Sequence, residues 1–211
     1  PVPFMRKLLE AEIPFVGRDV AMMRLREAFR RRFEGAAIRT SADSVAAVVL
    51  LGEPGIGKTR LMREFRATVT TLPPVVVGGD PYGKDVPCLP LGDPIARLWQ
   101  RRAIREGPGV AHGRAIEALL PGLQPPADPS GHEPTDQADL VRAVTDFLVE
   151  AGKQRPGTLF LDNLDGGDPI GPLVLADLLA REDNPWFVVA TARSVRGLPR
   201  CERLVLGGLE E

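Results

Sequence analysis

The sequence has few of the residues on which many enzyme sites depend. Two histidines, His112 and His132, and two cysteines, Cys88 and Cys201, occur among its 211 residues. With so little histidine, a histidine-based metal site or a Ser-His-Asp triad is disfavoured, which excludes many hydrolase classes. The cysteines lack metal-ligand spacing, and two isolated thiols are typical of a reducing compartment. We therefore expect a cytoplasmic protein whose cysteines are ordinary core or surface residues.

Long apolar runs and an excess of basic charge are also missing. No stretch approaches the ~20 apolar residues of a membrane span, and no basic-then-apolar signal peptide opens the sequence. Lys and Arg number 27 against 28 acidic residues, whereas a dedicated nucleic-acid binder usually carries a basic excess. The triplet Arg30, Arg31 and Arg32 is expected to be the solvated end of an amphipathic helix. The sequence thus predicts no membrane partner and no direct nucleic-acid binding.

Apolar patterning predicts helices that alternate with strands. Continuous β-branched and apolar runs are typical of strands buried in a parallel sheet. They lie at residues 44–51, 74–77, 158–161, 186–190 and 203–206. Helical spacing predicts helices at about residues 19–33, 58–71 and 170–180, and a longer helix capped by Thr135. This alternation indicates a doubly wound, mostly parallel α/β sheet of about five strands.

One segment matches the phosphate-binding pattern G-x-x-x-x-G-K-[ST]: residues 52–59, which read GEPGIGKT. Its glycines let the chain curl so that successive N–H groups face phosphate oxygens, and the following helix presents its positive end to the same anion. In this pattern Lys58 reaches the β- and γ-phosphates, and the Thr59 hydroxyl ligates Mg²⁺. The alternative, an ordinary Gly/Pro turn, matches by chance on the order of 1% of the time in such a chain. The segment therefore predicts nucleotide binding.

An acid after another buried strand extends this prediction. Asp162 follows the apolar run 158–161, and a P-loop needs such an acid at the end of a neighbouring strand to hold Mg²⁺. For Asp162 taken alone, the alternative is a structural cap at the strand end. The next residue is Asn163, whose amide can orient water but is a poor base. Asp165 and Asp168 are nearby substitutes for that role, and slow turnover is the expectation.

The segment after the fourth predicted strand offers a third candidate. Thr191 and Arg193 lie where a polar residue and a cation would sense whether a γ-phosphate is present. The alternative for Arg193 is an exposed arginine at a strand end. Its sensor role is therefore a hypothesis.

The motifs follow one another in an order that resembles a known family. Residues 15–19, the P-loop, residues 161–169 and residues 191–193 together resemble the nucleotide-binding domain of the STAND ATPases, within the AAA+ superfamily. The likeness is to the domain in large bacterial regulators of the MalT and LuxR type and in AAA-containing class III adenylate cyclases. Residues 82–87 also resemble a segment that recurs after their second strand. The similarity extends from about Pro14 to Leu209.

The resemblance implies ATP or ADP with Mg²⁺ as cofactors and a role for each motif residue. Asp162 and Thr59 would serve Mg²⁺, Lys58 would serve phosphate, and Arg193 would face the γ-phosphate. The nucleotide-binding residues implied are Val16, Gly17 and Arg18 on the adenine side, and Gly52, Gly55, Ile56, Gly57, Lys58, Thr59 and Arg60 on the phosphate side, Arg60 mainly through its backbone. The family usually has a second acid where Asn163 stands and an aromatic residue near Gly166. These departures affect the expected hydrolysis, not binding.

The expected function follows from the same resemblance. Residues 1–13 would be an extension or linker, and residues 14–211 the ATPase core, with a lid or winged-helix domain beyond. We expect an ATP/ADP switch with slow hydrolysis in a multidomain signalling or transcriptional regulator, partnered by nucleotide and by other domains or further copies. The alternatives are a P-loop small-molecule kinase and a hydrolysis-deficient nucleotide-binding scaffold for protein interactions.

Overall fold

The computed structural model describes nine parts of the chain. These are residues 17–34, 37–38, 44–69, 75–78, 91–100, 110–120, 134–154, 156–164 and 170–208. Several predicted features lie outside the described residues: Val16, the segment 82–87, and the two aspartates at 165 and 168. Within the described ranges, no helix has both the length and the apolar character needed to cross a bilayer.

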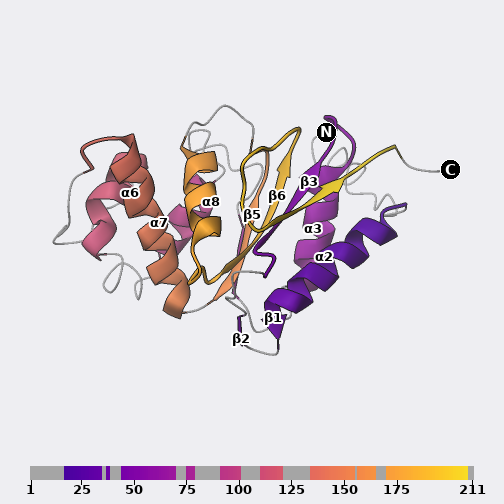
Figure 1. Cartoon of the computed structure of the whole chain (residues 1–211), viewed down its shortest axis with the longest axis horizontal. Coiled ribbons are helices and arrows are strands. Elements are labelled where there is room, and N and C mark those ends of the chain that lie inside the picture. Colours follow the sequence, from indigo (N-terminus) through magenta and orange to yellow (C-terminus); the bar gives the residue numbers. More distant parts are fainter. Residues whose placement is uncertain are drawn as a thin grey trace, which may run out of the picture.

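A five-stranded sheet forms the centre of the molecule, in the order β4-β5-β6-β3-β7 (Figure 1). All four pairings between its strands are parallel. The strands are β3 (Ala47–Leu51), β4 (Val75–Gly78), β5 (Gly157–Leu161), β6 (Trp186–Ala192) and β7 (Cys201–Val205). A separate antiparallel pair joins β1 (Phe33–Glu34) to β2 (Ala37–Ile38). The predicted α/β fold with a parallel sheet is therefore present.

Helices cover both faces of the sheet, as the doubly wound prediction requires (Figure 1). On one face lie α2 (Asp19–Arg32) and α3 (Lys58–Val69), and on the other α4 (Gly92–Trp99), α6 (Gly113–Leu119), α7 (Gln137–Gln154) and α8 (Gly171–Ala180), with the short 3-10 turn η1 (Val110–His112) before α6. Along β3, Val48 and Leu50 join the α2–α3 core, while Ala47 and Val49 join the opposite core. Because successive side chains of a strand point to opposite faces, this burial explains the continuous apolar run.

The order of the strands corrects one expectation. The strand that precedes Asp162, β5, is not a direct neighbour of the P-loop strand β3, because β6 lies between them. In the register, Thr191 pairs with Leu50, and Ala190 pairs with Leu161. The carboxyl ends of β3, β6 and β5 therefore meet at one edge of the sheet, and a residue of β6 stands between the two predicted motifs.

Arg32 corrects the expectation of a fully solvated arginine triplet. Arg30 and Arg31 are exposed, but Arg32 is completely buried. Its guanidinium group donates to Ser44 Oγ at 2.8 Å and to the main-chain oxygen of Asn184. Burial, with a contribution from neighbouring Arg200, lowers the pKa of Arg32 to about 10. The last turn of α2 is thereby bonded to segments at the amino ends of β3 and β6.

The start of α7 also differs from the prediction. The Asp136 carboxylate accepts a hydrogen bond from the backbone N of Asp139 at 2.8 Å, so Asp136 rather than Thr135 caps the helix. The Asp139 carboxylate in turn accepts a hydrogen bond from Thr135 N at 3.1 Å. Sequence spacing indicated the helix, but the choice between adjacent polar residues depended on the path of the chain.

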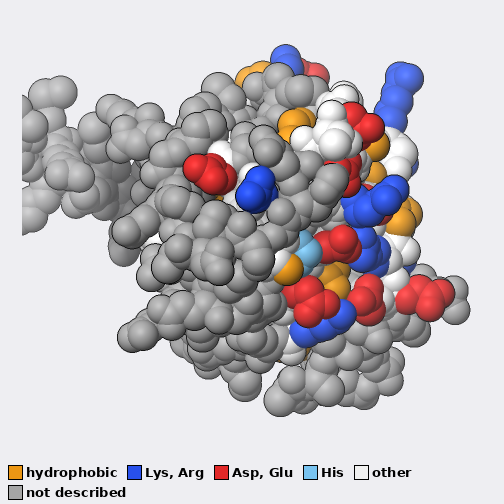
Figure 2. All heavy atoms as spheres, turned by 90° about the vertical axis from the view of Figure 1, so that its left-hand side faces the viewer, with side chains coloured by type: hydrophobic (Ala, Val, Ile, Leu, Met, Phe, Trp, Pro, Cys, Tyr) orange, Lys and Arg blue, Asp and Glu red, His pale blue; other side chains and the backbone are white. Residues whose placement is uncertain are grey.

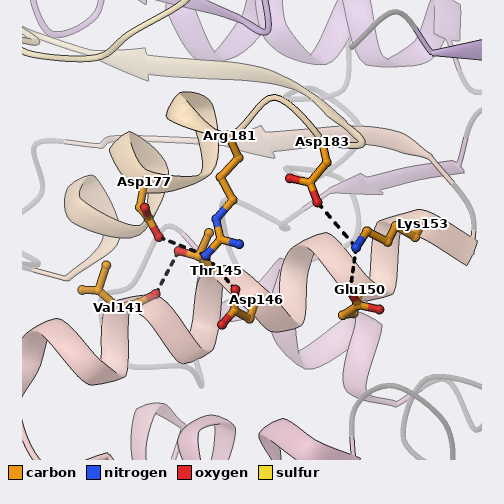
Figure 3. Close-up of polar contacts among 8 residues, drawn as sticks. All are labelled: Val141, Thr145, Asp146, Glu150, Lys153, Asp177, Arg181 and Asp183. Carbon is orange, nitrogen blue, oxygen red and sulfur yellow. Dashed lines mark hydrogen bonds and ion pairs between the residues drawn. The ribbon is translucent and has the colours of Figure 1, made fainter.

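Ion pairs join α7 to α8 and to the turn that follows it (Figure 3). The Arg181 guanidinium lies 2.6 Å from Asp146, and the Lys153 ammonium lies 2.7 Å from Glu150 and 3.5 Å from Asp183. Figure 2 shows acidic and basic side chains side by side on the face of the molecule that includes α6 and α7. Partly exposed pairs of this kind add little stability. The two helices, on the side of the sheet away from α2 and α3, pack mainly through the apolar core that they share.

Candidate functional site

The P-loop connects the end of β3 to the start of α3 in a conformation that glycine alone adopts readily. Gly55 and Gly57 have φ angles of 80° and 97°, in the region where a Cβ is strained. Gly52 has a φ of 151°, and a Cβ there would lie 2.9 Å from the main-chain oxygen of Leu206. The loop therefore needs these glycines both for its curvature and for its close approach to the chain after β7.

The amino end of α3 carries positive charge that its own side chains do not neutralise. Its first turn contains no acidic residue, so the helix dipole is available to an anion. The Lys58 ammonium donates to the main-chain oxygens of Gly52 at 2.7 Å and Glu53 at 2.9 Å. It thus lies folded over the loop, held by neutral acceptors that a phosphate would replace with charged ones.

The structure brings Thr59 and Asp162 together, although 103 positions separate them. The Thr59 hydroxyl donates to the Asp162 carboxylate, with distances of 3.0 Å to both oxygens. Thr191 also donates its hydroxyl hydrogen to Asp162 Oδ1. A hydroxyl and a carboxylate are hard oxygen ligands of the type that Mg²⁺ prefers. The donor set therefore fits magnesium, which would be held by Thr59 and Asp162 and would supply charge neutralisation to a bound polyphosphate.

A pocket of about 480 Å³ opens beside the loop. One wall is formed by Gly17 and Arg18 and by the start of α2, including Val20, and the other by the end of β7 with residues 206–208 after it. The Arg18 guanidinium donates to the main-chain oxygen of Ile56 at 3.0 Å, which ties the pocket to the P-loop. The family resemblance had already named Gly17 and Arg18 of the first wall. Sequence reasoning missed the β7 wall, because that segment carries no motif.

A comparison with protein-family models identifies the chain. The model of the AAA ATPase domain matches residues 14–189, which is most of the sequence. The chain belongs to this family. AAA ATPase domains are P-loop α/β domains that bind ATP with Mg²⁺, in agreement with the loop and the donor set described above. A comparison with curated proteins found no match.

In this AAA ATPase domain, Asn163 occupies an unusual backbone position. Its φ of 59° is left-handed, a region that asparagine tolerates better than most residues. The backbone N–H of Asn163 donates to Thr191 Oγ at 2.9 Å, and the backbone N–H of Leu164 donates to the Thr191 main-chain oxygen at 2.8 Å. The Asn163 side chain is exposed. The chain therefore turns sharply after Asp162, and Thr191 holds the turn.

The structure places the two remaining predicted residues at the same edge. Arg193 follows β6 directly and is exposed, and Arg60 is the third residue of α3 and is half-buried. The predicted sensor role of Arg193 stays a prediction. Thr191, which the sequence analysis put forward together with Arg193, contacts Asp162 directly. It is almost completely buried.

Proposed function

We propose that this AAA ATPase domain is an ATP/ADP-binding switch with slow hydrolysis, of the STAND type, within a multidomain signalling or transcriptional regulator. The observation that carries the proposal is the meeting of Lys58, Thr59 and Asp162 at the amino end of α3. These groups supply a cation for the phosphates and two oxygen ligands for Mg²⁺. The family match favours an ATPase over the small-molecule kinase alternative.

Slow hydrolysis is proposed because of Asn163. A general base beside the magnesium ligand would accept a proton from the attacking water, and an amide at that position cannot do so efficiently. Asparagine tolerates the left-handed backbone conformation found at position 163, so it fits the sharp turn that follows Asp162. A long-lived ATP state is what a switch requires, since the two nucleotide states must each persist long enough to be read.

The pocket beside the loop is proposed to take the nucleotide base. Its rim carries two exposed apolar side chains, Val20 and Val205, with exposed fractions of 68% and 76%. A flat aromatic ring would cover this apolar surface, and the hydrogen bond from Arg18 to Ile56 would couple base binding to the phosphate loop. Adenine is our proposal for the base, through the resemblance of Gly17 and Arg18 to the family motif.

Calorimetric titration of the purified chain with Mg-ATP and Mg-ADP tests the proposal. The native chain should bind both, and Lys58→Ala should weaken binding by about a hundredfold, because charge-assisted hydrogen bonds to phosphate are lost. Lys153→Ala is the matched control, since it removes a lysine on α7, on the other side of the sheet, and should leave binding unchanged. Absence of uptake by the native chain, or equal affinity of Lys58→Ala, would disprove nucleotide binding at this loop.

The switch itself has a separate test. If ATP and ADP stabilise different states, the full-length protein should differ in sedimentation or light scattering between the two nucleotides, and Lys58→Ala should abolish the difference. Identical behaviour with both nucleotides would leave a nucleotide-binding scaffold, the remaining alternative, as the better description.

A further inference from the structure

Thr191 both donates and accepts a hydrogen bond through its hydroxyl group within the protein. Its Oγ donates to Asp162 Oδ1 and accepts from the Asn163 amide at 2.9 Å. Its main-chain oxygen accepts from the Leu164 amide at 2.8 Å. The side chain is 1% exposed, on the strand that separates the P-loop strand from the strand of Asp162. One residue therefore holds three consecutive positions of the chain that carries the magnesium ligand.

This geometry leaves the Thr191 hydroxyl without a hydrogen for phosphate. A threonine hydroxyl has one hydrogen, and here it is directed to a carboxylate, which is a stronger acceptor than a neutral group. A residue that sensed the γ-phosphate would have to direct that hydrogen to the nucleotide instead. The observed arrangement thus favours a role toward Asp162 rather than toward the γ-phosphate.

We infer that Thr191 is a positioning residue that orients the Asp162 carboxylate for Mg²⁺. The inference rests on the proposed function, since it concerns the metal that accompanies the nucleotide. Two hydroxyls donate to the same carboxylate. Thr59, from the P-loop helix, is itself an expected metal ligand, whereas Thr191 lies in β6, between the P-loop strand and the strand that precedes Asp162. Substituting a residue that holds a metal ligand in place typically lowers metal affinity by about 10–100-fold.

The position of Thr191 in the sheet makes the orientation rigid. β6 pairs with β3 on one side and with β5 on the other, so its backbone cannot shift without breaking both pairings. The Asp162 carboxylate is therefore bonded to β6, the same strand that pairs with the P-loop strand β3. The distance between the phosphate loop and the metal ligand is therefore set by the sheet.

Thr191→Val removes the hydroxyl while preserving the shape of a β-branched side chain in a strand. Thr191→Ser restores the hydroxyl without the methyl group. Thr158→Val is the matched control, because Thr158 is a fully buried threonine of the neighbouring strand β5 whose hydroxyl has no hydrogen-bond partner within the described parts of the chain. Each variant is titrated calorimetrically with ADP and with ATP, in the presence of Mg²⁺ and again in EDTA.

The ratio of nucleotide affinity with Mg²⁺ to that in EDTA should be lower in Thr191→Val than in the native chain by about tenfold or more. The decrease should be equal for ADP and ATP, because the Asp162 carboxylate is no longer held. In EDTA the affinity of Thr191→Val should stay within about twofold of native, since the P-loop contacts to phosphate remain. Thr191→Ser and Thr158→Val should keep the native magnesium dependence. If Thr191→Val does not fold, Thr191→Ala provides the same comparison.

Four outcomes would overturn the inference. A loss confined to ATP would show that Thr191 contacts the γ-phosphate, and an equal loss in EDTA would show a general structural role. Native affinity and magnesium dependence in Thr191→Val would refute the positioning role while the proposed function stands. If the native chain bound no nucleotide at all, the proposed function and this inference would fail together.

Discussion

Replacing Asn163 by glutamate tests why hydrolysis should be slow. Asn163 directly follows Asp162 and its side chain is exposed, so a carboxylate there would keep its charge without a burial penalty. A positioned general base contributes typically about 10²–10⁴-fold to a rate. Because the glutamate would lie on an exposed turn rather than in a closed site, we expect the lower end, a rise of about a hundredfold in phosphate release.

The same change has a structural cost that the backbone defines. Asn163 has a φ of 59°, and a left-handed conformation costs residues other than glycine and asparagine about 1–2 kcal/mol. Since asparagine already bears part of this cost, Asn163→Glu should lower the free energy of unfolding by about 1 kcal/mol, or about 2–4 °C in Tm. The two hydrogen bonds from this turn to Thr191 come from backbone amides and survive the substitution. The rate should therefore rise although stability falls.

Single-turnover phosphate release, with protein in excess over Mg-ATP, measures the chemical step apart from product release. Asn163→Gln is the matched control, because glutamine has the length of glutamate and the same backbone strain but no carboxylate. It should lose the same stability and gain no rate. Equal rates for the two variants, or a glutamate variant that binds Mg-ATP normally and hydrolyses it no faster than native, would refute the assignment of slow turnover to this position.

Packing and charge elsewhere give two more expectations. A Cβ on Gly152 would lie 2.3 Å from the Pro185 ring. Gly152→Ala should therefore lower the free energy of unfolding by about 1–3 kcal/mol, although alanine has a better helix propensity than glycine. A native free energy of unfolding in urea would contradict this. Burial lowers the pKa of His112 below 6.5 more than Asp146 and Glu150 raise it. The folded state then binds fewer protons, so stability should fall as the pH drops through 6.5, and His112→Gln should flatten that part of the urea-unfolding profile; an unchanged profile would disprove it.

Short segments of the sequence were enough to locate the P-loop pattern and to select Thr59 and Asp162 as candidate metal ligands. The loop pattern requires glycines, a lysine and a threonine at fixed spacing between a strand and a helix, and each of these constraints acts within a few residues. Asp162 could be found because it ends an apolar run, and the structure indeed brings it within 3.0 Å of Thr59. Local chemistry of this kind is visible in a sequence because the backbone geometry that it needs is itself local.

The partners of these residues were decided only by tertiary structure. Neither the insertion of β6 between β3 and β5, nor the pairing that brings Thr191 to Asp162, follows from spacing along the chain. The same holds for the burial of Arg32 and for the β7 wall of the pocket. Strand order depends on which long-range contacts bury the most apolar surface and satisfy the most backbone groups. That is a property of the whole chain, and no short segment of it carries the information.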